Sequence, residues 1–145
     1  MTIDQFRRAA RFLGEAGIAL RVFVLAGLPF VGEEEALDWA RRSIAFAFDC
    51  GASAVTVIPT RAGNGALDAL AELGEFRPPR LSSLEGAAAF GLGLGRGRVF
   101  ADLWDLERLR GCEACFDERA SRLRAMNLRQ VVLRPVGCGV CGSLS

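Results

Sequence analysis

A run of β-branched residues near the middle of the chain constrains the fold most strongly. Residues 55–58 read Val-Thr-Val-Ile and lie between segments that contain glycine and proline. Such a run is typical of a short strand buried on both faces, as in a parallel sheet covered by helices. Pro59 has no amide hydrogen to donate to a neighbouring strand, so we expect the strand to end there.

The loop at residues 60–65 follows this strand and contains Gly63 and Gly65, which can adopt positive φ angles. Asn64 is placed to cap a helix that begins near Ala66. In parallel α/β proteins, ligands bind where a polar glycine loop joins a buried strand to a helix. A well-capped turn without a ligand explains the same residues equally well. The loop by itself therefore leaves both interpretations open.

Strands and helices alternate along the chain. Hydrophobic periodicity, glycines and capping residues predict helices at residues 2–13, 33–48, 66–73, 82–92 and 116–123, and strands at residues 19–26, 54–59, 98–104 and 130–133. This order implies an α/β fold with a parallel sheet and helices on its faces. Three strands do not close a barrel, which takes about 200 residues or more, and an uncovered strand edge promotes aggregation. We therefore expect the N-terminal region to be part of a larger sheet.

Two of the expected helices start with the sequence of a capping box. Thr2 with Gln5, and Ser82 with Glu85, have the required spacing. In this motif the first side chain accepts from a backbone N–H inside the helix, and the second side chain bonds back to the N–H of the capping residue. We expect both pairs to begin their helices in this way.

The composition limits the chemistry that the chain can carry out. Its 145 residues, of which 51% are hydrophobic and 24% charged, are enough for about one domain with a buried core. The net charge of +1 argues against a strongly basic nucleic-acid-binding protein. The absence of His excludes Ser-His-Asp and Cys-His nucleophiles and His-ligated metals. With no signal peptide and no apolar stretch that could cross a bilayer, we expect a cytoplasmic protein without a membrane partner.

Four of the five cysteines form two closely spaced pairs. Cys112 and Cys115, and Cys138 and Cys141, each follow a C-x2-C spacing, and residues 116–137 separate the pairs. This arrangement is close to that of a zinc ribbon. Four thiolates in a tetrahedral array suit Zn²⁺, with a single iron as the second choice, and such a closed site is structural rather than catalytic. Free thiols, or a disulfide within each pair, remain the alternatives.

Basic residues are concentrated around the cysteines. Residues 108–134 contain seven Arg and three acidic residues. Arg119, Arg122 and Arg124 are candidates for contacting the phosphates of a tRNA, as basic zinc modules can do. Because aromatic residues for base stacking are scarce here, a solvent-exposed helix face is the favoured alternative.

Several segments resemble the core of radical S-adenosylmethionine (SAM) enzymes. Residues 18–29 and the acidic helix start at residues 33–35 resemble the fifth strand and the following helix of that core. Residues 57–59 and 61–65 resemble its sixth strand and loop. The two late cysteine pairs are similar to those of the archaeosine-biosynthesis type of radical SAM protein and its bacterial relatives, as are residues 76–80, 100–105 and 125–128.

The resemblance implies a domain organisation. Residues 1–107 would form the C-terminal part of a (β/α) barrel, and residues 108–145 a small zinc-ribbon-like module with four cysteines. The Cys-x3-Cys-x2-Cys motif that binds a [4Fe–4S] cluster in the family is absent from this sequence, as are the first four strands. We therefore interpret Met1 as an internal methionine, and the N-terminal half of the barrel as missing or supplied by a separate chain.

The resemblance also implies candidate binding residues. The family's SAM adenine site corresponds to Leu25, Gly27, Val57, Ile58 and Pro59, and its substrate side to Arg61 and Asn64. SAM and the [4Fe–4S] cluster would be bound only by the complete enzyme, because these cofactors carry out the radical chemistry and the protein positions them. The chain is thus interpreted as the C-terminal segment of a radical SAM enzyme that modifies tRNA or another macromolecule and is inactive alone.

Two functions from other classes remain alternatives. The first is a small α/β zinc-binding interaction module that docks a separate partner. The second is a redox protein that uses the C-x2-C pairs, which requires a thiol of lowered pKa. An upstream reading frame with the three-cysteine motif would favour the enzyme, whereas a ribosome-binding site before Met1 would favour the interaction module.

Overall fold

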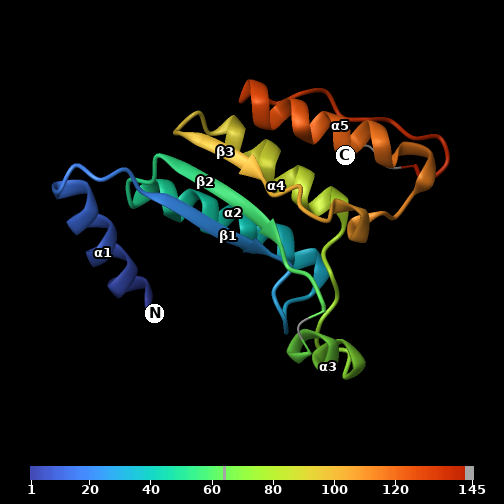
Figure 1. Cartoon of the computed structure of the whole chain (residues 1–145), viewed down its shortest axis with the longest axis horizontal. Helices are drawn as coiled ribbons and strands as arrows, with labels where there is room; N and C mark the ends of the chain where they lie inside the picture. Colours follow the sequence, from blue (N-terminus) through green and yellow to red (C-terminus); the bar gives the residue numbers. More distant parts are fainter. Residues whose placement is uncertain (64, 143–145) are drawn as a thin grey trace.

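The computed structural model describes residues 1–63 and 65–142. It is a mixed α/β structure with one three-stranded parallel sheet (Figure 1). In chain order, the elements are α1 (Ile3–Glu15), β1 (Arg21–Ala26), α2 (Glu33–Asp49), β2 (Ala54–Pro59), α3 (Ala66–Glu72), α4 (Leu81–Gly93), β3 (Arg98–Ala101), the 3-10 helix η1 (Leu106–Leu109) and α5 (Glu113–Arg129). The predicted alternation of strands with helices is confirmed, whereas no strand forms at residues 130–133.

The three strands lie side by side in their order along the chain. β2 is central and runs parallel to both β1 and β3, with Val57 opposite Ala101 of β3. β2 ends at Pro59, as predicted, because proline cannot donate a further ladder hydrogen bond. β3 is shorter than predicted and ends at Ala101. The chain turns there because the carboxylate of Asp102 accepts a hydrogen bond from the N–H of Trp104.

Helices α2 and α4 cover one face of the sheet (Figure 1). Alternate strand residues point to this face, and the side chains of Val55, Val57 and Val99 on it are at most 1% exposed. They belong to the same hydrophobic core as Ile44 of α2 and Leu84 of α4, which are fully buried. Each large apolar side chain buried in this way stabilises the fold by roughly 1.5–3 kcal/mol.

The opposite face of the sheet is largely open to solvent. Phe23 and Leu25 of β1 point to this face and are 63% and 49% exposed. Arg21 lies across it, with its guanidinium 5.6 Å from the ring of Phe23 and 5.3 Å from that of Phe100, and donates to the hydroxyl of Thr56 at 2.8 Å. These cation–π contacts hold the guanidinium over β2. The predicted burial of β2 on both faces is therefore met only at Thr56, which Arg21 covers and which is 6% exposed, whereas Ala54 and Ile58 on the same face are half-buried.

The two edges of the sheet differ. At the β3 edge, the backbone of Val99 bonds to the amide of Gln130, and the backbone of Ala101 bonds to the amide of Asn127. Both amides belong to the end of α5, which lies along β3 (Figure 1). At the β1 edge, none of the described residues forms a further strand. Side chains thus close the sheet at β3 and leave it open at β1.

One of the two predicted capping boxes forms. At α1, the N–H of Gln5 donates to Thr2 Oγ1 at 3.2 Å and the N–H of Thr2 donates to Gln5 Oε1 at 2.8 Å. The box predicted for Ser82 and Glu85 is wrong, because α4 begins without a capping side chain. Glu85 is instead 1% exposed and accepts hydrogen bonds from Arg119 of α5. Glu85 therefore pairs with the buried guanidinium of Arg119 on α5, and not with a backbone N–H at the start of its own helix.

The loop before α3 is held by a carboxylate. Asp68 accepts hydrogen bonds at 2.9 Å from the N–H groups of both Gly63 and Gly65. This satisfies backbone donors at the helix start, where the intrahelical partners are missing. The cap predicted at Asn64 lies outside the described residues.

The sheet and the cysteine-containing C-terminal region share one hydrophobic core. Phe116, Leu123 and Met126 of α5 belong to the same buried cluster as Leu84 and Val99. This contact explains how α5 is kept beside β3. The predicted domain boundary between residues 107 and 108 therefore does not separate two hydrophobic cores. The division of the chain into two domains remains a prediction.

Candidate metal centre

The four paired cysteines lie together. Their Sγ atoms are all within 4.8 Å of one another, and 3.9 Å separates Cys112 from Cys138 and Cys115 from Cys141. A tetrahedral zinc site with Zn–S bonds of about 2.3 Å has sulfur–sulfur separations of about 3.8 Å. A disulfide would require about 2.05 Å, and none of the five cysteines forms one. The predicted grouping is confirmed, and the site fits a four-coordinate metal such as zinc.

The path of the chain explains why two distant pairs meet. Cys112 is the N-cap of α5, and Cys115 lies in the first turn of the helix. After α5, the tail (residues 130–142) runs back along the helix (Figure 1). Arg122 holds this tail through two guanidinium hydrogen bonds to the carbonyl of Leu133, at 3.0 and 3.2 Å. The return of the tail brings the second cysteine pair to the start of α5.

Cys115 is the most enclosed of the four thiols, with 3% of the residue exposed. Burial, followed by hydrogen bonding with Cys112 and Cys138, raises the pKa of Cys115 to about 12. Arg119 acts in the opposite direction by donating to Cys115. A metal ion must therefore displace a proton from this thiol. Because a reactive redox cysteine needs a lowered pKa, this shift argues against a redox role for Cys115.

Arg119 and Arg122 are buried. Arg119 donates from Nε to Glu85 of α4 at 3.0 Å, and Arg122 donates from Nη1 to the same carboxylate at 3.2 Å. The side chains of the two arginines are 9% and 6% exposed, and that of Glu85 is 1% exposed. The interpretations as phosphate-binding or solvated residues are therefore wrong for these two, since a carboxylate on another helix holds them inside. Arg124 is exposed.

The five residues predicted to hold the SAM adenine are distributed over both sides of the sheet. Val57 and Pro59 face the helices and are buried, whereas Leu25 and Ile58 lie on the open face. Neighbouring strand residues point to opposite faces, so the side chains of Val57 and Ile58 cannot meet. Gly27 follows β1 at the C-terminal end of the sheet.

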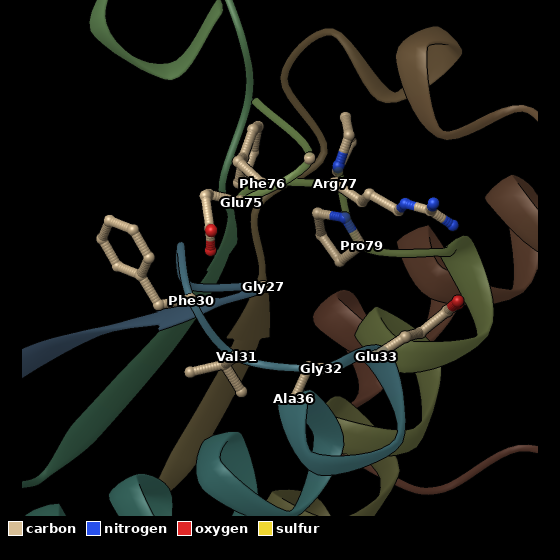
Figure 2. Close-up of a pocket in the computed structure, with 12 residues that line it drawn as sticks. Gly27, Phe30, Val31, Gly32, Glu33, Ala36, Glu75, Phe76, Arg77 and Pro79 are labelled. Atoms are coloured by element: carbon tan, nitrogen blue, oxygen red, sulfur yellow. The ribbon is translucent and has the colours of Figure 1, made fainter. Parts of the chain in front are cut away.

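A cavity of about 330 Å³ lies at this end of β1 (Figure 2). The β1–α2 loop and the segment between α3 and α4 line it, and they meet where the N–H of Phe30 donates to Glu75 O at 2.8 Å. Gly27, with a φ of 76°, lines the cavity, and a Cβ there would lie 2.7 Å from Pro79 Cδ. No sequence spacing links these two loops, so sequence reasoning missed Phe30, Glu75 and Pro79.

The guanidinium of Arg61, predicted to face the substrate, is engaged by the protein itself. Its Nη1 donates to Asp102 at 3.0 Å and to Pro59 O at 3.2 Å, and its Nη2 donates to Trp104 O. The guanidinium also lies 5.3 Å from the ring of Trp104. This side chain is 10% exposed and holds together the segments that follow β2 and β3. Asn64, predicted beside it, lies outside the described residues.

The four cysteines form the one group of potential metal ligands found among the described residues. In the same part of the chain, no helix combines the length and the apolar character needed to cross a membrane. Comparisons with protein-family models, curated proteins and solved structures find no match to this chain.

Proposed function

We propose that the four cysteines bind one zinc ion in a structural site. The observation that carries this proposal is the sulfur geometry, since the 3.9 Å separations are close to the edge of a zinc–thiolate tetrahedron. Thiolates are soft ligands that favour zinc over magnesium or calcium. Four protein ligands leave no open position, so the ion would stabilise the fold rather than activate water. Such reduced thiols are maintained in the cytoplasm, where we place the protein.

Metal content tests this site. We expect about one zinc per chain, as for other structural four-cysteine sites, when protein purified without added metal is analysed by mass spectrometry. A Cys138→Ser variant should lose the metal. A Cys50→Ser variant should keep it, because Cys50 lies outside the cluster. Iron with sulfide would show that the cysteines hold a cluster instead, and metal-free wild-type protein would refute the site.

We further propose that residues 1–107 are the C-terminal part of a radical SAM (β/α) barrel. The sheet supports this proposal, because its parallel strands follow the chain order and helices α2 and α4 lie on one face. In a (β/α) barrel the helices form one outer ring, whereas in a doubly wound sheet the strand order reverses and helices cover both faces. The [4Fe–4S] cluster and SAM would be bound by the complete enzyme, and this segment would be inactive alone.

The remaining strands of the barrel would join at β1. An apolar groove of about 270 Å³ lies beside this strand, and residues of α1, β1 and α2 line it, among them Phe6, Phe23, Leu25 and Phe46. The occupant that we propose is a parallel strand of the N-terminal half, either from the same polypeptide or from a separate chain. The other edge is unsuited to this role, because amide side chains of α5 already pair with the backbone of β3.

In such a barrel, the candidate SAM residues would have different tasks. Leu25 and Ile58, on the open face, would contact the adenine, and Gly27 would allow close approach to the backbone. Val57 and Pro59 would support the strand from the helix side. Arg61 would hold the loops after β2 and β3 in place.

The proposed substrate, a tRNA or another macromolecule, follows from the resemblance. Arg119 and Arg122 are buried and do not add to a phosphate-binding surface. Arg124, Arg129 and Arg134 are exposed near the cysteines and are the remaining candidates. A tRNA-binding assay with Arg124→Gln would test this part, and the expected result is weaker binding with a shallower salt dependence.

Co-expression tests the barrel. The DNA upstream of the Met1 codon should encode a segment with the three-cysteine motif, and that segment should co-purify with this chain and bind SAM. A Phe23→Asp variant should block the association, because it places a charge in the groove beside β1. A Leu73→Asp variant should associate normally, since Leu73 is 75% exposed at the end of α3 and away from the groove.

The alternative is a zinc-binding interaction module. The same open edge of β1 supports it, because an exposed edge can accept a strand from an unrelated partner. In that case the strand would come from a chain without the three-cysteine motif, and the complex would bind no SAM. Identifying the partner whose binding is lost in the Phe23→Asp variant therefore distinguishes the radical SAM enzyme from the interaction module.

A further inference from the structure

A buried cluster of charges lies beside the four-cysteine site. Glu85 of α4 accepts hydrogen bonds from both Arg119 and Arg122 of α5. Among the described residues, no second carboxylate pairs with either arginine. The cluster therefore holds two positive charges and one negative charge, and a surplus charge in the interior is costly unless another group offsets it.

The cysteine site lies where it can offset this charge. Cys115 lies one helical turn before Arg119 on α5, and both residues are buried. A divalent ion bound by four thiolates carries more negative than positive charge. The metal-bound site would thus supply the negative charge that the arginine pair lacks, whereas four neutral thiols would not.

The same charge cluster holds three segments together. Glu85 lies on α4, the two arginines lie on α5, and Arg122 also bonds to Leu133 in the tail. The far end of α5 carries the amides that pair with β3. Weakening the hydrogen bonds of Arg119 and Arg122 to Glu85 would therefore loosen the packing of α5 against α4 and β3.

Building on the zinc site proposed above, we propose that metal binding at the four cysteines locks α5 onto α4 and the β3 edge through Arg119 and Glu85. With metal bound, the thiolates and Glu85 together neutralise the arginines. Without metal, Arg119 and Arg122 have one carboxylate between them, and α5 is held less firmly. Metal occupancy then decides whether the β3 edge is closed or free.

Backbone hydrogen exchange tests this coupling on the full chain. The N–H of Val99 donates to Gln130 at 2.9 Å and that of Ala101 donates to Asn127 at 2.8 Å, so both report on α5. On removal of zinc with a chelator, we expect these two amides to exchange at least about tenfold faster, through local opening. The N–H of Thr60, which donates to Ala26 O between β1 and β2 at 2.9 Å, should change little.

Charge variants separate this mechanism from simple packing. In Arg119→Gln, Glu85 and Arg122 balance each other, so zinc should raise Tm less than in the wild type. In Glu85→Gln, the surplus positive charge is larger, so zinc should raise Tm more. Arg8→Gln, which removes an exposed arginine of α1, should behave like the wild type. If Arg119 and Glu85 contributed only packing, the two substitutions would not change the zinc-induced rise in Tm in opposite directions.

Metal affinity gives the second readout. By competition with a chromophoric chelator, Arg119→Gln should bind zinc about 10–100-fold more weakly, the loss that is typical when a side chain supporting a metal site is removed. If the wild type binds no zinc, the proposed site and this coupling both fail. If the wild type binds zinc but exchange at Val99 and Ala101 is unchanged by its removal, or Arg119→Gln binds equally tightly, the zinc site stands and the coupling is refuted.

Discussion

Asn127 of α5 pairs with the backbone of Ala101 in β3 through both of its amide atoms. The N–H of Ala101 donates to Asn127 Oδ1 at 2.8 Å, and Asn127 Nδ2 donates to Ala101 O at 2.9 Å. Gln130 repeats this arrangement with Val99, at 2.9 and 3.0 Å. Residues two apart on a strand present their backbone groups to the same edge. The side-chain amides of Asn127 and Gln130 therefore fill the hydrogen-bonding positions that a fourth strand would occupy.

Replacing Asn127 with Leu should lower the free energy of unfolding by roughly 1–3 kcal/mol, because the N–H and C=O of Ala101 would lose their partner. Urea titration followed by circular dichroism measures this loss. The matched control is Leu128→Ala, whose side chain is 85% exposed and should change stability by less than about 0.5 kcal/mol. Equal stability of the two variants would contradict the role assigned to Asn127.

Gly27 and Gly17 provide a test of close packing at the end of β1. Both have positive φ angles, of 76° and 70°, but a Cβ at Gly27 would lie 2.7 Å from Pro79, whereas nothing lies within 4 Å at Gly17. Gly17→Ala should cost about 1–2 kcal/mol for the backbone conformation alone. Gly27→Ala should cost about 1–3 kcal/mol more through overpacking. Similar losses in thermal unfolding would show that Pro79 moves aside freely.

Arg61 should contribute more to stability than an exposed arginine. Arg61→Leu removes the partner of Asp102 and of two backbone carbonyls at a site where Arg61 is 10% exposed, and it should cost roughly 1–3 kcal/mol. Arg42→Leu removes an ion pair with Asp38 whose side chains are 67% and 55% exposed, and it should cost less than about 1 kcal/mol. Denaturant titration of both variants makes the comparison, and a cost at Arg61 no larger than at Arg42 would overturn it.

The raised pKa of Cys115 predicts two pH dependences. Zinc affinity should increase with pH, because the metal competes with the proton on this thiol. The metal-free protein should lose stability as pH rises from about 9 towards 12, since the unfolded chain releases the proton of Cys115 at lower pH than the folded chain. The zinc-bound protein, whose thiol is already deprotonated, should lack this loss.

Thermal unfolding between pH 7 and 10, with zinc and with chelator, checks the second dependence. A Cys115→Ser variant without metal serves as the control, because it lacks the titrating thiol. A metal-free wild type that is equally stable across this range would show that Cys115 is not protonated in the way the structure implies.

Local patterns were sufficient to predict several features of this protein. β2 and its end at Pro59 follow from β-branched residues and from the missing amide hydrogen, which are properties of neighbouring residues. The capping box at Thr2 is likewise complete within four residues. The four cysteines could be grouped because each C-x2-C pair forms its own short segment and four thiolates share one preferred geometry.

The partners of Glu85, Arg119 and Arg122 were decided only by the tertiary structure. Periodicity predicted helices at residues 82–92 and 116–123, which lie within the longer α4 and α5 of the structure. It left Glu85 where it could cap its own helix and the arginines where they could face solvent. The fold then set α4 opposite α5, so that Glu85 meets Arg119 across 34 positions of sequence. Periodicity identifies the apolar side of a helix but not the helix that lies against it. Whether a charged residue is exposed or paired in the interior therefore depends on a contact between helices that no local pattern contains.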